Sequence, residues 1–185
     1  MIKRSFDIIF VILFSPLIIA IFFFIFILSL IFNKREIFFF QYRGGYKGKR
    51  IKIIKFRTME NKTKKISSFN NFLRKVRFDE IPQFLNVAKG DLSIVGPRPL
   101  HYEYKDIYSS RQNKRFKVKP GLTGLAQIQD SHSMSWSKQF KIDVWYVENH
   151  NLFLDIKIII KTLFVIMKST SKKEIKDKKK FNGSN

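Results

Sequence analysis

The chain has 185 residues, no cysteine and a formal net charge of +22, from 36 Lys and Arg against 14 Asp and Glu. The length predicts a single domain, and the lack of cysteine excludes disulfides and thiolate metal sites. The charge is too high for an ordinary soluble enzyme. It indicates a polyanionic partner, either a nucleic acid or an anionic membrane surface.

The first element is an apolar run from Ile8 to Phe32 that contains no charged residue. A straight helix of this length would extend roughly 37 Å, which is enough to cross a bilayer. A cleaved signal peptide is the alternative, but the run is too long and no small-residue cleavage site follows it. Nucleic-acid-binding proteins rarely carry such a segment, so the basic charge favours lipid headgroups over nucleic acid.

Cations flank both ends of this run, so the positive-inside rule gives no orientation. That symmetry is expected if both ends stay on the cytoplasmic side. Within the run, Ser15-Pro16 predicts a kink, because proline lacks an amide donor and clashes with the preceding turn. The Ser15 hydroxyl can satisfy a carbonyl that the break frees. These residues alone leave a kinked spanning helix and a re-entrant helix equally open.

Residues 37–59 have the pattern of a β-hairpin, with two runs rich in Ile, Phe and Tyr around a glycine-containing turn. The second run carries Lys55 and Arg57. Residues 68–78 have helical spacing, with one predicted apolar face made of Phe69, Phe72, Leu73 and Val76. Pro82 suits the first turn of a further helix, which Gly90 is expected to end.

Residues 90–100 predict a short strand that closes in a Pro-Arg-Pro turn, and residues 115–128 predict a glycine-containing loop. Two helices are expected over residues 134–150 and 152–169. The last has an apolar stripe made of Phe153, Ile156, Ile160, Phe164 and Met167. The Lys-rich residues 171–185 are expected to form a basic, flexible, solvated tail.

Two scarce carboxylates, Asp79 and Glu80, stand side by side just before Pro82. At the start of a helix, the dipole and the free amide groups would stabilise their charge. Ile81 precedes the proline, so it is expected to leave the α region and to re-aim the pair. The simpler interpretation makes Asp79 an N-cap and Glu80 a first-turn acid, and taken alone it is favoured.

Cations near the pair change this balance. Arg98 is fixed between two prolines on a stiff turn, and a guanidinium held this way suits bidentate phosphate recognition. Lys55, Arg57 and Arg74 supply further positive charge, although each taken singly is more simply a solvated or headgroup-facing residue. Together, a carboxylate pair and cations beside a membrane suit phosphoryl chemistry, with one carboxylate attacking phosphorus or holding Mg²⁺.

The motifs, in this order, resemble those of the bacterial sugar transferases. These are monotopic phosphoglycosyl transferases that load a phosphosugar onto undecaprenyl phosphate. The matching segments are KRSFD, the Ser-Pro pair, QYRGGYKGK with KFRTM, LRKVRFDEIPQFLNVAKGDLSIVGPRPL, KPGLTGLAQI and DVWYVENHNLFLDIKIIIKT. They cover nearly the whole chain, and the central block is highly specific.

The resemblance implies a mechanism. Asp79 matches the nucleophile of an Asp-Glu dyad, which would attack a UDP-sugar, release UMP and hold the phosphosugar covalently until undecaprenyl phosphate attacks. Asp79 would also sit at the Mg²⁺, and Glu80 would assist. Substrate-binding roles are implied for Lys55, Arg57, Arg74, Arg98 and Asp143. Ser15-Pro16 matches the break of a re-entrant helix that enters and leaves one leaflet.

The expected protein is α+β and mainly helical. It has a re-entrant membrane helix (1–35) with a Ser-Pro break, a cytoplasmic catalytic domain (36–170) with a small hairpin and interfacial amphipathic helices, and the tail (171–185). It would be monotopic on the cytoplasmic face of the inner membrane, with a UDP-sugar, undecaprenyl phosphate and the anionic surface as partners and no nucleic acid.

One departure from the family concerns the segment after GLAQI, where relatives often have Asn-Gly-Arg-Asn. Here the segment runs from Gln129 to His132 without an arginine, so the sugar preference stays open. An N-acetylated UDP-hexose is the donor expected by resemblance to small members. A non-catalytic membrane scaffold for glycan assembly is the second hypothesis, which the intact dyad argues against.

Overall fold

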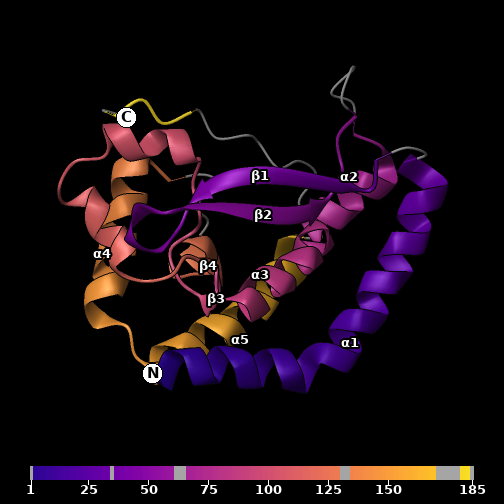
Figure 1. The fold of residues 1–185 in the computed structure, drawn as a ribbon, viewed down its shortest axis with the longest axis horizontal. Helices are drawn as coiled ribbons and strands as arrows, with labels where there is room; N and C mark the ends of the chain where they lie inside the picture. Colours follow the sequence, from indigo (N-terminus) through magenta and orange to yellow (C-terminus); the bar gives the residue numbers. More distant parts are fainter. Residues whose placement is uncertain (1, 34–35, 61–65, 130–133, 170–179, 184–185) are drawn as a thin grey trace.

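The computed structural model describes residues 2–33, 36–60, 66–129, 134–169 and 180–183 (Figure 1). The fold is mainly helical with a small antiparallel hairpin, as the sequence predicts. The α-helices of the described residues are α1 (Ile2–Asn33), α2 (Ser68–Lys75), α3 (Phe84–Lys89), α4 (Trp136–Asn149) and α5 (Leu152–Ser169). The strands are β1 (Phe38–Gly44), β2 (Arg50–Phe56), β3 (Ser93–Val95) and β4 (Gly121–Thr123). Short 3₁₀ helices are η1 (Tyr46–Gly48), η2 (Phe78–Gln83), η3 (Tyr102–Ile107), η4 (Gln112–Lys117) and η5 (Gln127–Gln129).

Helix α1 is long and apolar enough to cross a membrane, and it turns sharply near its middle (Figure 1). Pro16 lies inside the helix. The Ser15 hydroxyl donates a hydrogen bond of 2.7 Å to the carbonyl of Ile12. That carbonyl is four residues before Pro16, so it is the one that the missing proline amide leaves free. The predicted kink and its compensation by serine are therefore confirmed.

The first leg of α1 (residues 2–15) is held to the globular body (residues 36–169) by charged side chains. Lys3 pairs with Asp155 of α5. Arg4 donates to two carbonyls in the last turn of α3, at 2.6 and 2.7 Å. Asp7 is buried and accepts hydrogen bonds from the Ser93 hydroxyl (2.9 Å) and the next amide of β3 (3.0 Å). The KRSFD segment therefore fixes the start of α1 to three elements of the body.

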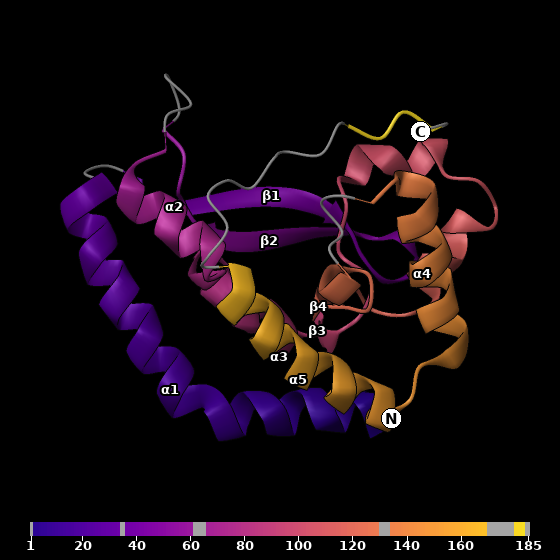
Figure 2. The ribbon, with the colours of Figure 1, turned by 180° about the vertical axis from the view of Figure 1, so that it is seen from behind.

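The second leg of α1 (residues 17–33) packs against the same body through apolar side chains. Ile25 is buried in a cluster with Phe56 of β2 and Leu73 of α2. The rings of Phe32 and Phe69 stack with centroids 4.8 Å apart. The body therefore lies within the angle between the two legs, as Figure 2 shows from behind.

The hairpin is confirmed, with β1 and β2 antiparallel from the Phe38–Phe56 pair to the Gly44–Arg50 pair. The central core lies between this hairpin, β3, α3, α4 and α5. Its buried members are Ile51, Ile53, Val87, Leu92, Ile94, Val95, Tyr146 and Ile158. This core fixes the position of the segment between α2 and β3, which carries the two adjacent carboxylates.

The expected loop over residues 115–128 is wrong in part. It contains the end of η4, the start of η5 and strand β4, which pairs in parallel with β3. Strand β4 has only three residues and its partner β3 is distant in the chain, so no local sequence pattern predicts it. A Cβ added to Gly121 would lie 2.1 Å from the amide nitrogen of Gly96. Glycine is needed here because the two backbones touch.

The two C-terminal helices are confirmed, and all five stripe residues of α5 face outward. Phe153, for example, is 67% exposed. A contiguous apolar face of this kind marks an interaction surface and is not part of the core. α5 therefore adds an apolar face to that of α1, as expected of an interfacial amphipathic helix.

Phe181 differs from the expectation of a solvated tail. It is 4% exposed and packs with Leu100, Tyr108, Trp136 and Phe140. The Lys-rich composition around it predicts solvation, but a single aromatic side chain can dock where the body offers an apolar cluster. The rest of the predicted tail, residues 171–179 and 184–185, lies outside the described residues.

Candidate functional site

Asp79 and Glu80 lie inside η2, just after a sharp change of chain direction. Arg77, at the N-terminal end of η2, adopts a left-handed conformation (φ 58°, ψ 24°), which ends the α2 segment. Such a conformation is unusual for a residue with a side chain and is found at special sites. The turn directs both carboxylates toward β2 and the Pro-Arg-Pro segment.

Three local expectations for this segment are wrong. Asp79 is not an N-cap, because η2 begins after Arg77 and α3 begins only at Phe84. Ile81 stays in the 3₁₀ helix despite the following proline, since this tighter helix also holds Pro82. On α2, Phe72 is exposed, so the predicted apolar face is narrower than its spacing indicates.

Glu80 is held by cations from three different segments. Lys55 of β2 forms an ion pair and hydrogen bond with its Oε1. Arg98 approaches the same oxygen at 3.4 Å, and Arg77 approaches Oε2 at 3.9 Å. Burial alone would raise the pKa of Glu80, but these charges outweigh burial and hold it well below its usual range. Glu80 is therefore a fixed anion that organises the cations around it.

Asp79 has a different environment. Within the described part of the chain, its carboxylate has no hydrogen bond or ion pair. Burial, followed by the charge of Glu80, raises the pKa of Asp79 to about 6, against the pull of Lys55, Arg74 and Arg98. Neighbouring carboxylates whose pKa values are pushed apart are typical of catalytic pairs. Asp79 is ionised above this pH and is available to a ligand.

The Pro-Arg-Pro turn that carries Arg98 is fixed from behind. The amide of Gly121 donates to the carbonyl of Pro97 at 3.1 Å. The Arg115 side chain donates to the carbonyl of Arg98 at 2.6 Å. Arg98 therefore reaches Glu80 from a rigid backbone, as its two prolines lead one to expect.

Lys55, Arg74 and Arg98 thus gather around the two carboxylates, whereas two other predicted residues do not. Arg57 pairs with Glu36 at 2.9 Å, at the far end of the hairpin from its turn. Asp143 is buried in an ion pair of 3.0 Å with Arg115. Asp143 therefore acts on the site only indirectly, because its partner Arg115 holds the backbone of Arg98.

Sequence reasoning assigned no role to two arginines of this site, Arg77 and Arg43, although Arg77 is close to the carboxylates in the sequence. Arg43 lies on β1, where burial and then the charge of Arg98 lower its pKa to about 10. Its Nε is buried without a hydrogen-bond partner. The only local signal is its place in the QYRGG motif, because its proximity to Glu80 depends on how the hairpin packs.

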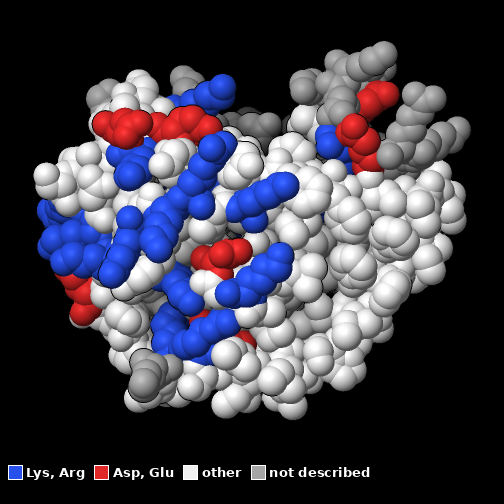
Figure 3. Space-filling model, viewed as in Figure 1, with Lys and Arg blue, Asp and Glu red and all other residues white. Residues whose placement is uncertain are grey.

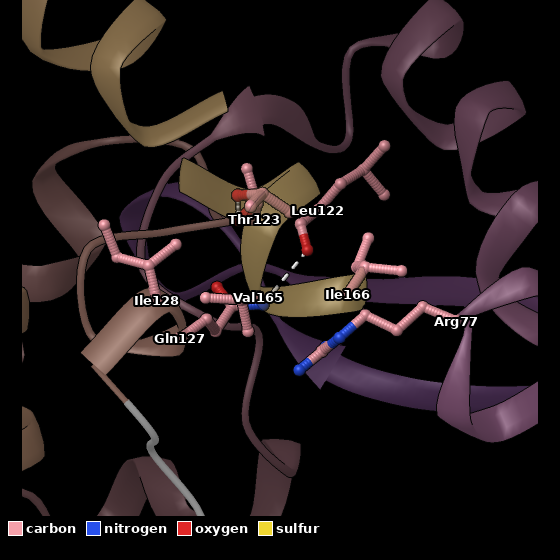
Figure 4. A pocket seen from close by; sticks show the side chains of 8 residues that line it. Arg77, Leu122, Thr123, Gln127, Ile128, Val165 and Ile166 are labelled. Carbon is pink, nitrogen blue, oxygen red and sulfur yellow. Dashed lines mark hydrogen bonds between the residues drawn. The ribbon is translucent and has the colours of Figure 1, made fainter. Parts of the chain in front are cut away.

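A small pocket lies where Arg77 meets residues of β4, η5 and α5 (Figure 4). Its lining residues are Arg77, Leu122, Thr123, Gln127, Ile128, Thr162, Val165 and Ile166. The Gln127 side chain is buried and donates to the carbonyl of Leu122 at 3.0 Å, while its Oε1 has no partner. The pocket thus has an apolar wall from α5 and a cation beside the carboxylates.

Basic residues also dominate the outer surface. In Figure 3 the Lys and Arg side chains gather over the side of the molecule away from the second leg of α1, which itself is uncharged. A basic face next to an apolar helix has the charge complementarity that anionic headgroups and phosphate-bearing substrates require.

Comparison with known proteins gives a clear relationship. A model of the bacterial sugar transferase family matches residues 1–169. The uncharacterized sugar transferase EpsL of Bacillus subtilis is 45% identical over 143 residues, which cover 72% of this chain and 71% of the relative. The exopolysaccharide production protein ExoY of Rhizobium meliloti is 33% identical over 196 residues, covering 88% of this chain and 84% of ExoY.

A further relative has a more specific name. The UDP-glucose:undecaprenyl-phosphate glucose-1-phosphate transferase of Klebsiella pneumoniae is 39% identical over 152 residues, which cover 71% of this chain and 33% of that longer protein. With its dyad, its Pro-Arg-Pro turn and its bent apolar helix, this chain belongs to the bacterial sugar transferase family.

Proposed function

We propose that the protein transfers a sugar-1-phosphate from a UDP-sugar to undecaprenyl phosphate, at the start of membrane glycoconjugate assembly. The names of the relatives support the reaction class. The observation that carries the proposal is the contrast between Glu80, which three cations engage, and Asp79, which has no partner among the described residues. An ionised carboxylate free of ion pairs, within a cluster of cations, is suited to attack phosphorus.

In the first step, a carboxylate oxygen of Asp79 attacks the β-phosphorus of the donor. The new oxygen–phosphorus bond forms as the phosphoanhydride bond breaks, and UMP leaves with the bridging oxygen and its electron pair. In the second step, a phosphate oxygen of undecaprenyl phosphate attacks the same phosphorus. Asp79 then leaves as a free carboxylate, and the product is a lipid-linked diphosphosugar.

The cations of the site offset charge on the phosphates during both steps. Arg98 presents its guanidinium from a rigid turn, and Lys55 and Arg74 lie within electrostatic reach of Asp79. Charges fixed before the reaction stabilise the transition state without reorganisation. Because the intermediate is covalent, the soluble nucleotide can leave before the lipid enters.

A Mg²⁺ ion fits this site only together with the donor. No group of three or more metal-ligating side chains occurs among the residues that the structure describes. Mg²⁺ usually keeps several waters and uses one or two carboxylates plus substrate phosphates, and Asp79 supplies one such carboxylate. Bound there, the ion would neutralise charge on the diphosphate.

We further propose that α1 is re-entrant and that the protein is monotopic on the cytoplasmic face of the inner membrane. The support is that both legs of α1 pack against one body, through Lys3, Arg4 and Asp7 at one end and Ile25 at the other. A straight spanning helix would carry one of these ends to the opposite side. The outward stripe of α5 would lie at the same interface.

We also propose that the acceptor approaches through the pocket beside Arg77. Leu122, Val165 and Ile166 offer an apolar wall that borders the exposed face of α5. Arg77 lines the same pocket and approaches Glu80 at 3.9 Å. An amphiphile with a phosphate head matches both properties, since its chain needs an apolar contact and its head a cation.

Trapping of the intermediate tests the proposed function. The purified protein in nanodiscs is incubated with Mg²⁺ and a panel of UDP-sugars, without acceptor, and its intact mass is measured. We expect a phosphosugar adduct on the wild type, none on Asp79→Asn, and discharge of the adduct when undecaprenyl phosphate is added. No adduct and no UMP release with any donor would contradict the proposal and favour the non-catalytic scaffold.

A further inference from the structure

The C-terminal Phe181 occupies a defined place in the body although the described helix before it, α5, ends at Ser169. Its ring lies 5.0 Å from that of Phe140, 5.6 Å from Trp136 and 5.7 Å from Tyr108 and Tyr104. Figure 1 shows this segment beside α4 and the 3₁₀ helices, on the opposite side of the molecule from the bend of α1. Four aromatic rings, from α4, from η3 and from the residue just after η3, thus form a socket for one side chain.

The same aromatic rings hold Arg115. Its guanidinium lies 5.4 Å from the ring centre of Phe140 and 5.8 Å from that of Tyr108. It donates to the Tyr108 hydroxyl at 3.2 Å and pairs with Asp143 at 3.0 Å. Arg115 is 4% exposed, so its orientation depends on the packing of the rings that surround it.

Arg115 in turn holds the backbone of Arg98, because it donates to the Arg98 carbonyl at 2.6 Å. Arg98 contacts Glu80 at 3.4 Å. An unbroken series of contacts therefore leads from Phe181, through Tyr108 and Phe140, to Arg115 and then to Arg98. Each contact is between described residues, and none of the first three side chains touches the carboxylates.

We propose that Phe181 is a positioning residue: by completing the aromatic socket it fixes Arg115 and, through it, the phosphate-binding Arg98. The inference rests on the proposed function for the role of Arg98. It gives the C-terminus of the chain a part in donor binding, although its sequence has the composition of a solvated tail.

Phe181→Ala tests the proposal, with Phe181→Leu as the conservative variant. Phe153→Ala makes the same change at an exposed phenylalanine of α5 and serves as the control. The measurement is the rate of adduct formation without acceptor, as a function of donor concentration. We expect Phe181→Ala to raise the half-saturating donor concentration about tenfold, which corresponds to the loss of roughly 1.4 kcal/mol of donor binding. At saturating donor, the rate of adduct formation should return to that of the wild type.

The donor dependence separates the positioning of Arg98 from partial unfolding. A displaced Arg98 weakens donor binding, so the rate recovers at saturating donor, whereas partial unfolding lowers the rate at saturation as well. Phe181→Leu should restore the donor dependence of the wild type. The proposal is overturned if the donor dependence of Phe181→Ala matches that of the wild type, or if its rate falls equally at every donor concentration.

Hydrogen exchange of the peptide that spans residues 92–104 gives a second measurement, independent of chemistry. We expect faster exchange around the Pro-Arg-Pro turn in Phe181→Ala and unchanged exchange in Phe153→Ala. If the wild type forms no adduct, the proposed function fails, while the exchange result still decides whether Phe181 fixes the turn. Unchanged exchange in Phe181→Ala would refute the positioning role even in an active enzyme.

Discussion

The position of Asp79 makes a thermodynamic prediction that can be separated from catalysis. Its folded-state pKa of about 6 lies above the ordinary value of 3.8. The unfolded chain therefore ionises first, and ionisation costs the folded state stability as the pH rises from about 4 to 6, after which the cost is constant. Replacement of Asp79 by the neutral asparagine should remove this cost, so an inactive variant should be more stable than the wild type.

The size of the effect follows from the shift. Two pKa units correspond to about 3 kcal/mol, and solvent screening of this half-buried side chain reduces that to roughly 1.5–3 kcal/mol. For a chain of this length, each kcal/mol moves the melting temperature by about 2–4 °C. We therefore expect Asp79→Asn to melt roughly 3–12 °C above the wild type near neutral pH.

Thermal unfolding of both proteins in one detergent, at about pH 7.5 and about pH 4, measures this difference. Most of the gain should vanish at the lower pH, because the folded carboxyl is then protonated and the unfolded one is only about half ionised. Glu80→Gln is the matched control, and its effect on stability should have the opposite sign. The cations around Glu80 lower the pKa of its carboxyl, so its ion pairs stabilise the fold. We expect that variant to lose roughly 3 kcal/mol near neutral pH. An Asp79→Asn variant no more stable than the wild type, or a gain independent of pH, would refute the electrostatic reasoning.

Further variants test other features. Glu36→Cys should be labelled by a membrane-impermeant thiol reagent from the same side as Ile2→Cys, because both legs of α1 pack against one body; labelling of the two from opposite sides would contradict the re-entrant arrangement. Gly121→Ala forces a contact of 2.1 Å with Gly96 and should cost more than about 3 kcal/mol, so an unchanged melting temperature would argue against the close approach of β3 and β4. Arg77→Gly suits the left-handed backbone and should slow discharge by undecaprenyl phosphate more than it slows adduct formation, whereas equal slowing of both steps would remove the acceptor role of Arg77.

The sequence predicts those features whose cause is local. The kink at Pro16, the hairpin and the helices α4 and α5 each follow from residues a few positions apart. Strand β4 has no such signal, because three residues with glycine become a strand only when β3 lies beside them. The docking of Phe181 was missed for the same reason, since its socket comes from residues distant in the chain.

In the site, the sequence predicts the carboxylate pair and Arg98 from their residue types and order. It does not predict the different environments of Asp79 and Glu80. Only packing shows that Lys55 pairs with Glu80 and leaves Asp79 without an ion pair among the described residues. Packing also separates Arg57 from the carboxylates, although it lies two positions from Lys55. The left-handed Arg77 has no sequence signature, because nothing local favours that conformation for an arginine.

The attachment of Lys3 to Asp155 has a consequence for biosynthesis. The two residues are 152 positions apart, so at roughly 5–20 residues per second the ribosome adds Asp155 about 8–30 s after Lys3. The contacts of Arg4 and Asp7 also form late, because they need α3 and β3 respectively. The apolar partners of the second leg, Phe56 and Leu73, are made much sooner. The second leg of α1 can therefore pack against the hairpin and α2 before the charged contacts of the first leg can form.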